Sequence, residues 1–109
     1  MTIHSTGKKA YTVVVAPAEV DIASSNALRD DLERAIQGGN PWVIADLSNV
    51  EFIDSTGLGA ILAAHHLAEQ YGGTLVVVGP AERTQKLLTI TQIDRVLDIY
   101  PTVEDVPEP

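Results

Sequence analysis

The run Asp54-Ser55-Thr56-Gly57-Leu58-Gly59 places a carboxylate, two hydroxyls and two glycines within six consecutive residues. It stands between an apolar segment typical of a strand and the apolar spacing of a helix. The free backbone N–H groups of a helix start favour an anion there, so a phosphoryl group on Ser55 would meet a partly prepared environment. Thr56 is the rival acceptor. The same residues can also be ordinary helix caps, with Gly57 only easing the entry into the helix.

Elsewhere in the chain, the sequence offers few residues that could carry out enzymatic chemistry. A hydrolase using Ser55 would need a general base within hydrogen-bond reach. His65 and His66 are two to three turns further along the predicted helix, about 15 Å away by helix rise. They point roughly 100° apart, so they cannot chelate one metal together, and we expect both on a solvated face. The absence of cysteine excludes disulfides, thiolate metal sites and thiol catalysis.

Two phosphate-handling classes are also disfavoured. No Lys-Ser/Thr pair follows a glycine loop, which excludes a phosphate-binding loop of the nucleotidase type. A receiver domain would use Asp54 as its acceptor, but it needs an adjacent pair of acids after the first strand and a late lysine. Glu19 and Asp21 are not adjacent, and Lys86 lies inside a predicted helix. The sequence therefore predicts a protein that is not an enzyme and has no metal or cofactor.

The charge of the chain limits its partners. Seven basic residues against 15 acidic ones give a formal net charge of −8. Such a surface repels phosphate backbones and anionic lipid heads, so neither nucleic acid nor membrane is expected as a partner. No apolar run approaches the ~20 residues that span a bilayer, and the first residues do not resemble a signal peptide. We expect a cytoplasmic protein. The negative charge would favour a basic protein partner, although acidic surfaces also arise simply for solubility.

Strands alternate with helices along the 109 residues, which predicts one α/β domain with a mostly parallel sheet. Nearly continuous apolar segments predict strands over 11–16, 42–47, 74–78 and 96–100. Helical spacing predicts helices that begin at 24–26, run from 54 to 71, and begin again at 80 or 81. Residues 1–10 are either a short edge strand or a loose arm. The acidic, proline-containing tail 101–109 is expected to fray.

The stretch from Phe52 to Ala60 resembles the signature of the STAS domain, and in particular that of the bacterial anti-sigma factor antagonists. Glu19-Val20-Asp21 is similar to the family's Gly-Glu-Leu-Asp stretch, and 43–47 to its central strand. Gly72-Gly73 and Gly79-Pro80 also stand at the expected separations. The resemblance covers about residues 8–100. It implies a single STAS-like domain over 1–109, with helices packed against a central mixed, mostly parallel sheet.

The resemblance further implies a partner switch. In the family, the serine after the motif aspartate is phosphorylated by a serine-kinase anti-sigma factor and dephosphorylated by a PP2C-type phosphatase; here that serine is Ser55. The unphosphorylated form binds the kinase and frees the sigma factor, and phosphorylation releases the antagonist. The resemblance implies a monomer or weak dimer. The surroundings of the phosphosite, which also bind the partner, would be Asp21, Asp54, Thr56, Gly57, Leu58 and Gly59.

Several roles stay open at this stage. Asp21 and Asp54 either shape the phosphosite or only cap turns and helices, and Leu58 is either a buried anchor or an apolar contact for the partner. The same family also supplies non-enzymatic scaffolds and transporter-associated subunits without a sigma-factor switch. Three features depart from the family pattern: Ala18 replaces a common glycine, the segment after Tyr100 is short and rich in proline, and His65-His66 replaces other polar residues.

Overall fold

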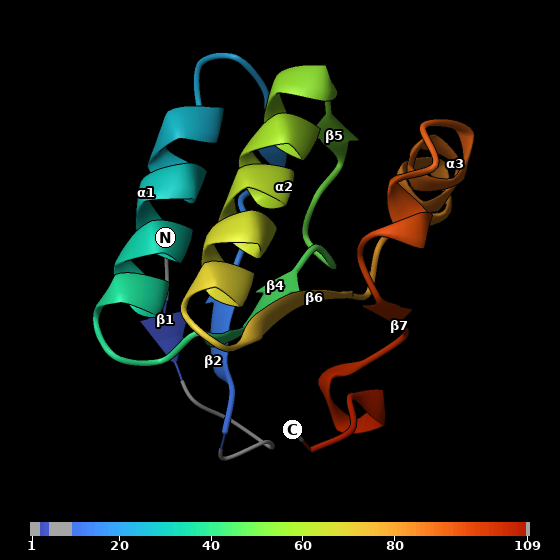
Figure 1. The fold of residues 1–109 in the computed structure, drawn as a ribbon. Coiled ribbons are helices and arrows are strands. Elements are labelled where there is room, and N and C mark those ends of the chain that lie inside the picture. The colour runs from blue at the N-terminus through green and yellow to red at the C-terminus, as the bar shows by residue number, and fades with distance from the viewer. Residues whose placement is uncertain (1–2, 5–9, 109) are drawn as a thin grey trace.

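A five-stranded sheet forms the centre of the computed structural model, which describes residues 3–4 and 10–108 (Figure 1). The antiparallel edge strand β1 is followed by four mutually parallel strands, so the predicted mixed, mostly parallel sheet is confirmed. Their order across the sheet is β1 (Ile3–His4), β2 (Thr12–Val15), β4 (Trp42–Asp46), β6 (Thr74–Val78) and β7 (Ile99–Tyr100). Of the two predictions for residues 1–10, the edge strand is confirmed at 3–4; 1–2 and 5–9 lie outside the described residues.

The parallel strands are buried on both faces, which explains their unbroken apolar sequences. Side chains alternate between the faces: Val43 and Ala45 of β4 join one apolar cluster, and Ile44 between them joins the other. The larger cluster lies beneath two helices, α1 (Ser25–Gln37) and α2 (Ser55–Gln70), which pack side by side on the same face of the sheet (Figure 1).

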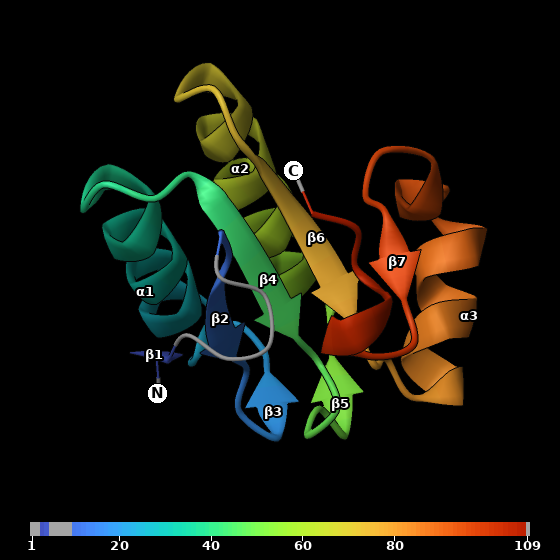
Figure 2. The same cartoon turned by 90° about the horizontal axis from the view of Figure 1, so that it is seen from below.

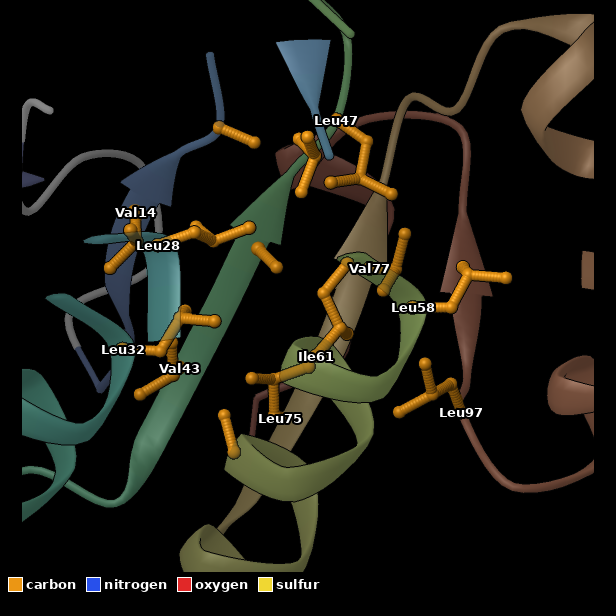
Figure 3. Packing of buried hydrophobic residues seen from close by; sticks show 14 of the residues in the cluster. Val14, Leu28, Leu32, Val43, Leu47, Leu58, Ile61, Leu75, Val77 and Leu97 are labelled. Atoms are coloured by element: carbon orange, nitrogen blue, oxygen red, sulfur yellow. The ribbon is translucent and has the colours of Figure 1, made fainter. Parts of the chain in front are cut away.

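Leucine and isoleucine side chains at helical spacing fill the layer between these helices and the sheet (Figure 3). Leu28 and Leu32 of α1 face Val14 and Val43 of the sheet, and Ile61 of α2 meets Leu75. Each such side chain, when fully buried, contributes about 1.5–3 kcal/mol to folding. The hydrophobic spacing seen in the sequence therefore predicted both helices correctly.

The C-terminal segment covers part of the opposite face of the sheet, so the prediction that it frays is wrong. After β7, a single 3₁₀ turn (Val103–Asp105) forms, in which Thr102 Oγ1 donates to Asp105 Oδ2 at 2.9 Å. Val106 is only 1% exposed and packs with Tyr11, Ile44 and Val76. Figure 2 shows the red segment against the sheet. The apolar contacts of Val103 and Val106 thus hold the tail against the sheet, although its acidic residues and prolines suggested that it would be disordered.

The third helix lies at the β7 edge of the sheet rather than beside α1 and α2 (Figure 2). This helix, α3 (Glu82–Ile90), is followed by a 3₁₀ turn (Ile93–Arg95). Gln92, the residue before that turn, has a left-handed backbone conformation with φ of 63°. The predicted strand over 96–100 is correspondingly shorter: β7 has only two residues, because Val96 and Leu97 still belong to the turn.

Two further strands, which the sequence did not predict, carry the segments that lead into α1 and α2. They are β3 (Glu19–Val20) and β5 (Phe52–Ile53), and they form a separate parallel pair. Two-residue strands are too short for any periodicity, and their existence depends on each other's hydrogen bonds. This small sheet holds the loops that follow it, where the Asp-Ser-Thr run lies. Among the described residues, no helix is long and apolar enough to cross a membrane.

Candidate functional site

The pairing of β3 with β5 brings the two motif aspartates to neighbouring positions. Glu19 is in register with Phe52 and Val20 with Ile53, so Asp21 and Asp54 are the next residues of the two strands. The pair is extended by one more bond, in which Asp54 N donates to Val20 O at 3.1 Å. Both helices that follow therefore begin at the same end of the molecule (Figure 1).

Asp54 is the N-cap of α2. Its Oδ1 accepts a hydrogen bond from Gly57 N at 3.0 Å, which satisfies one of the free amides of the first turn. Ser55 and Thr56 follow in that first turn and are exposed. Among the described residues, neither hydroxyl has a hydrogen-bond partner. Both are thus open to an incoming group, and the geometry alone does not choose between them.

Asp21 organises the turn into α1. Its Oδ1 accepts hydrogen bonds from Ala23 N at 2.9 Å and from Ser24 N at 3.1 Å. The side chain of Ser24 makes no cap bond of its own to the helix but accepts from Asp21 N at 3.0 Å. This tight turn directs Ile22 outward, where it is 77% exposed. The capping role that the sequence left open for each aspartate is therefore observed for both.

The two glycines of the motif have opposite surroundings. A Cβ on Gly57 would stand 2.6 Å from Val20 O and 2.9 Å from Ile53 Cγ1, so the helix start lies directly on the small sheet. A Cβ on Gly59 would meet nothing within 4 Å. Gly57 is thus required by a close approach of backbones, whereas Gly59 leaves open space one turn after Ser55.

Leu58, between the glycines, belongs to the hydrophobic core. It is 3% exposed and points into the layer between α2 and the sheet (Figure 3). Of the two roles open to it, the structure shows the buried anchor. The reason is helical phase, since Ile61 lies three residues on and shares its face.

His65 is buried, against the prediction of a solvated face, while His66 is exposed as predicted. The Nδ1 atom of His65 lies 3.2 Å from Leu75 O, and its Nε2 lies 3.5 Å from the Glu69 carboxylate. Its spacing of seven from Leu58 and four from Ile61 puts it on the core face, a signal that the polar residue type obscured. His65 ties α2 to strand β6.

Exposed apolar side chains border the site, and sequence reasoning missed them. Phe52 of β5 is 48% exposed, three residues before Ser55, and Ile22 stands beside Asp21. The half-buried aspartates and the exposed Glu19 add negative charge. Exposed apolar groups around a polar centre are typical of a protein-binding surface. The arrangement is a small α/β domain that presents two exposed hydroxyls in the first turn of α2.

Comparison with known proteins identifies the family. The STAS domain family matches residues 2–106, and the chain belongs to it. An anti-sigma F factor antagonist from Paenibacillus polymyxa is 30% identical over 89 residues, which are 81% of this chain and 76% of that protein. An anti-sigma-B factor antagonist from Bacillus subtilis is 32% identical over 81 residues, covering 74% of this chain and 73% of the relative.

Solved structures agree with this assignment. The crystal structure of an anti-sigma factor antagonist from Mycobacterium paratuberculosis superposes with a TM-score of 0.75 at 30% identity, covering 95% of this chain and 88% of the other. The predicted STAS-like fold is thereby confirmed.

Proposed function

We propose that this protein is an anti-sigma factor antagonist that acts in a partner switch, with Ser55 as its phosphorylation site. Unphosphorylated, it binds a serine-kinase anti-sigma factor, which then releases its sigma factor. The kinase transfers the γ-phosphoryl group of ATP to Ser55 Oγ, whose proton is lost, and ADP leaves. The observation that carries the proposal is the exposed, unbonded hydroxyl of Ser55 directly after the capping Asp54.

Ser55 rather than Thr56 is assigned as the acceptor because it is the residue that follows the motif aspartate in the family pattern. Its position at the first residue of α2 also suits a phosphoryl group, since the helix N-terminus stabilises negative charge by about 0.3–1 kcal/mol. The modified protein should therefore remain folded.

Electrostatics supports release on phosphorylation. A phosphoserine adds about −1.5 to −2 charge. At Ser55 this charge would stand beside Asp54, close to Asp21, in a chain whose net charge is already −8. A surface on the partner that fits the unmodified site then faces unpaired like charge, which costs several kcal/mol at a docked interface.

The contact surface in this proposal is the exposed rim of the site. Ile22 and Phe52 supply apolar contacts to the partner. The exposed hydroxyls of Ser55 and Thr56, which follow the end of β5, face the partner directly. A PP2C-type phosphatase returns the protein to its binding state by hydrolysing the phosphoserine. The protein itself catalyses nothing in this cycle: it is a binding partner and a substrate.

The test is phosphorylation by the serine-kinase anti-sigma factor encoded in the same genome. Incubation with that kinase and ATP, followed by intact-mass measurement, should show one added phosphoryl group on the wild type and on Thr56→Ala, and none on Ser55→Ala. Ser55→Ala should still bind the kinase, because losing one side chain of the first turn leaves the Asp54 cap intact. Stoichiometric phosphate on Thr56 in the Ser55→Ala variant would refute the acceptor assignment. Binding without any phosphate transfer would indicate a scaffold instead.

A further inference from the structure

An apolar groove lies beside the proposed phosphosite, between β5 and α3. This β5–α3 groove has a volume of about 380 Å³; the apolar side chains Phe52, Ile53, Leu87 and Ile90 and the cations Arg83 and Lys86 line it. Ile90 is 77% exposed and Phe52 48%, although both sit on regular elements. A groove of this size at the small end of the ligand range fits one or two side chains of another protein.

The charge of the groove is opposite to that of the chain. Two cations line it against one carboxylate, that of Glu51, in a protein of net charge −8. Arg83 has no ion-pair partner among the described residues. The Nζ atom of Lys86 lies 3.5 Å from the Glu82 carboxylate, and both side chains are mostly exposed. Such a surface ion pair is weak, so Glu82 neutralises the charge of Lys86 only slightly. The groove therefore favours an apolar side chain that is accompanied by carboxylates.

The groove is continuous with the phosphosite. Phe52 and Ile53 lead directly into Asp54 and Ser55, and Figure 1 shows β5 between the start of α2 and α3. Three residues of chain span at most about 11 Å. A standard protein interface buries about 800 Å² on each partner, a patch roughly 30 Å across. A protein docked over Ser55 therefore also covers the groove.

We infer that the β5–α3 groove is a second contact for the anti-sigma kinase, and that it receives a bulky apolar side chain flanked by acidic residues of that kinase. The inference rests on the proposed function, because it names the same partner. It adds a requirement on charge: the kinase surface is basic where it faces Asp21 and Glu19 and acidic where it faces Arg83. A kinase surface with one basic and one acidic region would fix the orientation of the kinase over Ser55.

The test compares kinase affinity for unphosphorylated groove variants and matched controls, by titration calorimetry. Arg83→Glu should weaken binding about tenfold or more, and Arg83→Gln should weaken it less, because reversal adds repulsion to lost attraction. Arg95→Glu makes the same change in net charge at an exposed residue outside the groove and should bind as the wild type does. Ile90→Ser should also weaken binding, and Val96→Ser, at an exposed apolar residue outside the groove, should not.

The outcomes separate this inference from the proposed function. If Ser55→Asp loses affinity while the Arg83 and Ile90 variants bind as the wild type does, the groove inference fails and the switch stands. Arg83→Glu binding more tightly would mean a basic occupant and would overturn the acidic one. If Ile90→Ser only turns a dimer into a monomer in light scattering, the occupant is a second copy and the inference is wrong. Wild type that neither binds the kinase nor becomes phosphorylated would overturn both proposals. Thermal unfolding of each variant confirms that it is folded.

Discussion

Asp21 and Asp54 occupy equivalent positions at the carboxyl ends of the paired strands β3 and β5, and each accepts backbone N–H bonds in the turn that follows. One strand pair thus sets the starting points of α1 and α2 together. Asp54 holds the Ser55 turn in place and Asp21 holds the turn into α1, each through its Oδ1 atom, so the second carboxylate oxygen of each takes no part in these bonds.

Replacing Ser55 by aspartate should imitate phosphorylation only in part. Aspartate brings one negative charge where phosphoserine brings about −1.5 to −2, and its shorter side chain keeps that charge near the helix amides. Kinase binding should therefore weaken without vanishing, and salt should reduce the effect because the rim is screened over ~8–10 Å. Calorimetry on wild type, Ser55→Asp and phosphorylated protein at two salt concentrations measures this. Wild-type affinity for Ser55→Asp at low salt would refute the electrostatic account.

Adding a methyl group to the two motif glycines should have opposite effects on stability. Gly57→Ala should lower the free energy of unfolding by about 1–3 kcal/mol, because its Cβ would collide with the Val20 carbonyl and the Ile53 side chain. Gly59→Ala, in open space within the same helix, should raise it by up to about 1 kcal/mol through helix propensity. Urea unfolding of both variants provides the comparison. Equal losses would show that the helix start does not rest on the small sheet.

The adjacent histidines should differ in their contribution to folding. His65→Ala should cost about 1–3 kcal/mol, because it removes a buried ring together with its contact to the Leu75 carbonyl. His66→Ala should change stability by no more than about 0.5 kcal/mol, since that side chain is exposed. The midpoint of urea unfolding distinguishes the two. A larger loss from His66→Ala would contradict the placement of α2.

Alkaline pH should destabilise the fold through Tyr11. Burial raises the pKa of the Tyr11 phenol, and Tyr100, Glu108 and Asp98 raise it further by their charge. The folded state thus holds this proton more tightly than the unfolded state. The resulting stability is complete below the ordinary phenol pKa of about 10 and is lost as pH rises through the raised value.

Tyr11→Phe removes this titration, so the free energy of unfolding should fall less between about pH 8 and about pH 11 than it does in the wild type. Tyr71→Phe is the control, because Tyr71 is 53% exposed and should keep the wild-type dependence. Identical slopes for wild type and Tyr11→Phe would contradict this assignment.

Local pattern was sufficient for the parts of the fold that are buried continuously. β4 and β6 are unbroken apolar segments, and α1 and α2 carry core residues at helical spacing, so these elements were predicted nearly to their ends. The strands β3 and β5 could not be predicted in the same way, since two residues carry no period and each exists only through the other. β7 was placed too early because Val96 is apolar but exposed.

The sequence indicated where the candidate site lies, but it did not indicate how the residues of the site are packed and held in place. Residue types identified the Asp-Ser-Thr run, yet the reason for Gly57 lies in its close approach to Val20 of β3, which is distant in the sequence, and to Ile53 of the neighbouring β5. Leu58 was left open and His65 was placed on the wrong face for one reason: the decision between core and surface depends on the phase of the helix, not on residue chemistry. The exposure of Phe52 is a tertiary property with no local signal, whereas that of Ile22 follows from the turn that Asp21 organises.

The contact between Gly57 and the Val20 carbonyl has a consequence for how fast the proposed switch can act. Because the backbone of this first turn packs directly against Val20 and Ile53, we expect phosphorylation of Ser55 to leave the backbone of the turn in place. In that case the partner recognises the presence or absence of the phosphoryl group itself, and not a change in the fold of the domain. The two states of the proposed switch would then interconvert at the rates at which the kinase and the phosphatase act and the partners dissociate, with no slow internal rearrangement between them, and the phosphorylated state would last as long as the phosphate ester does.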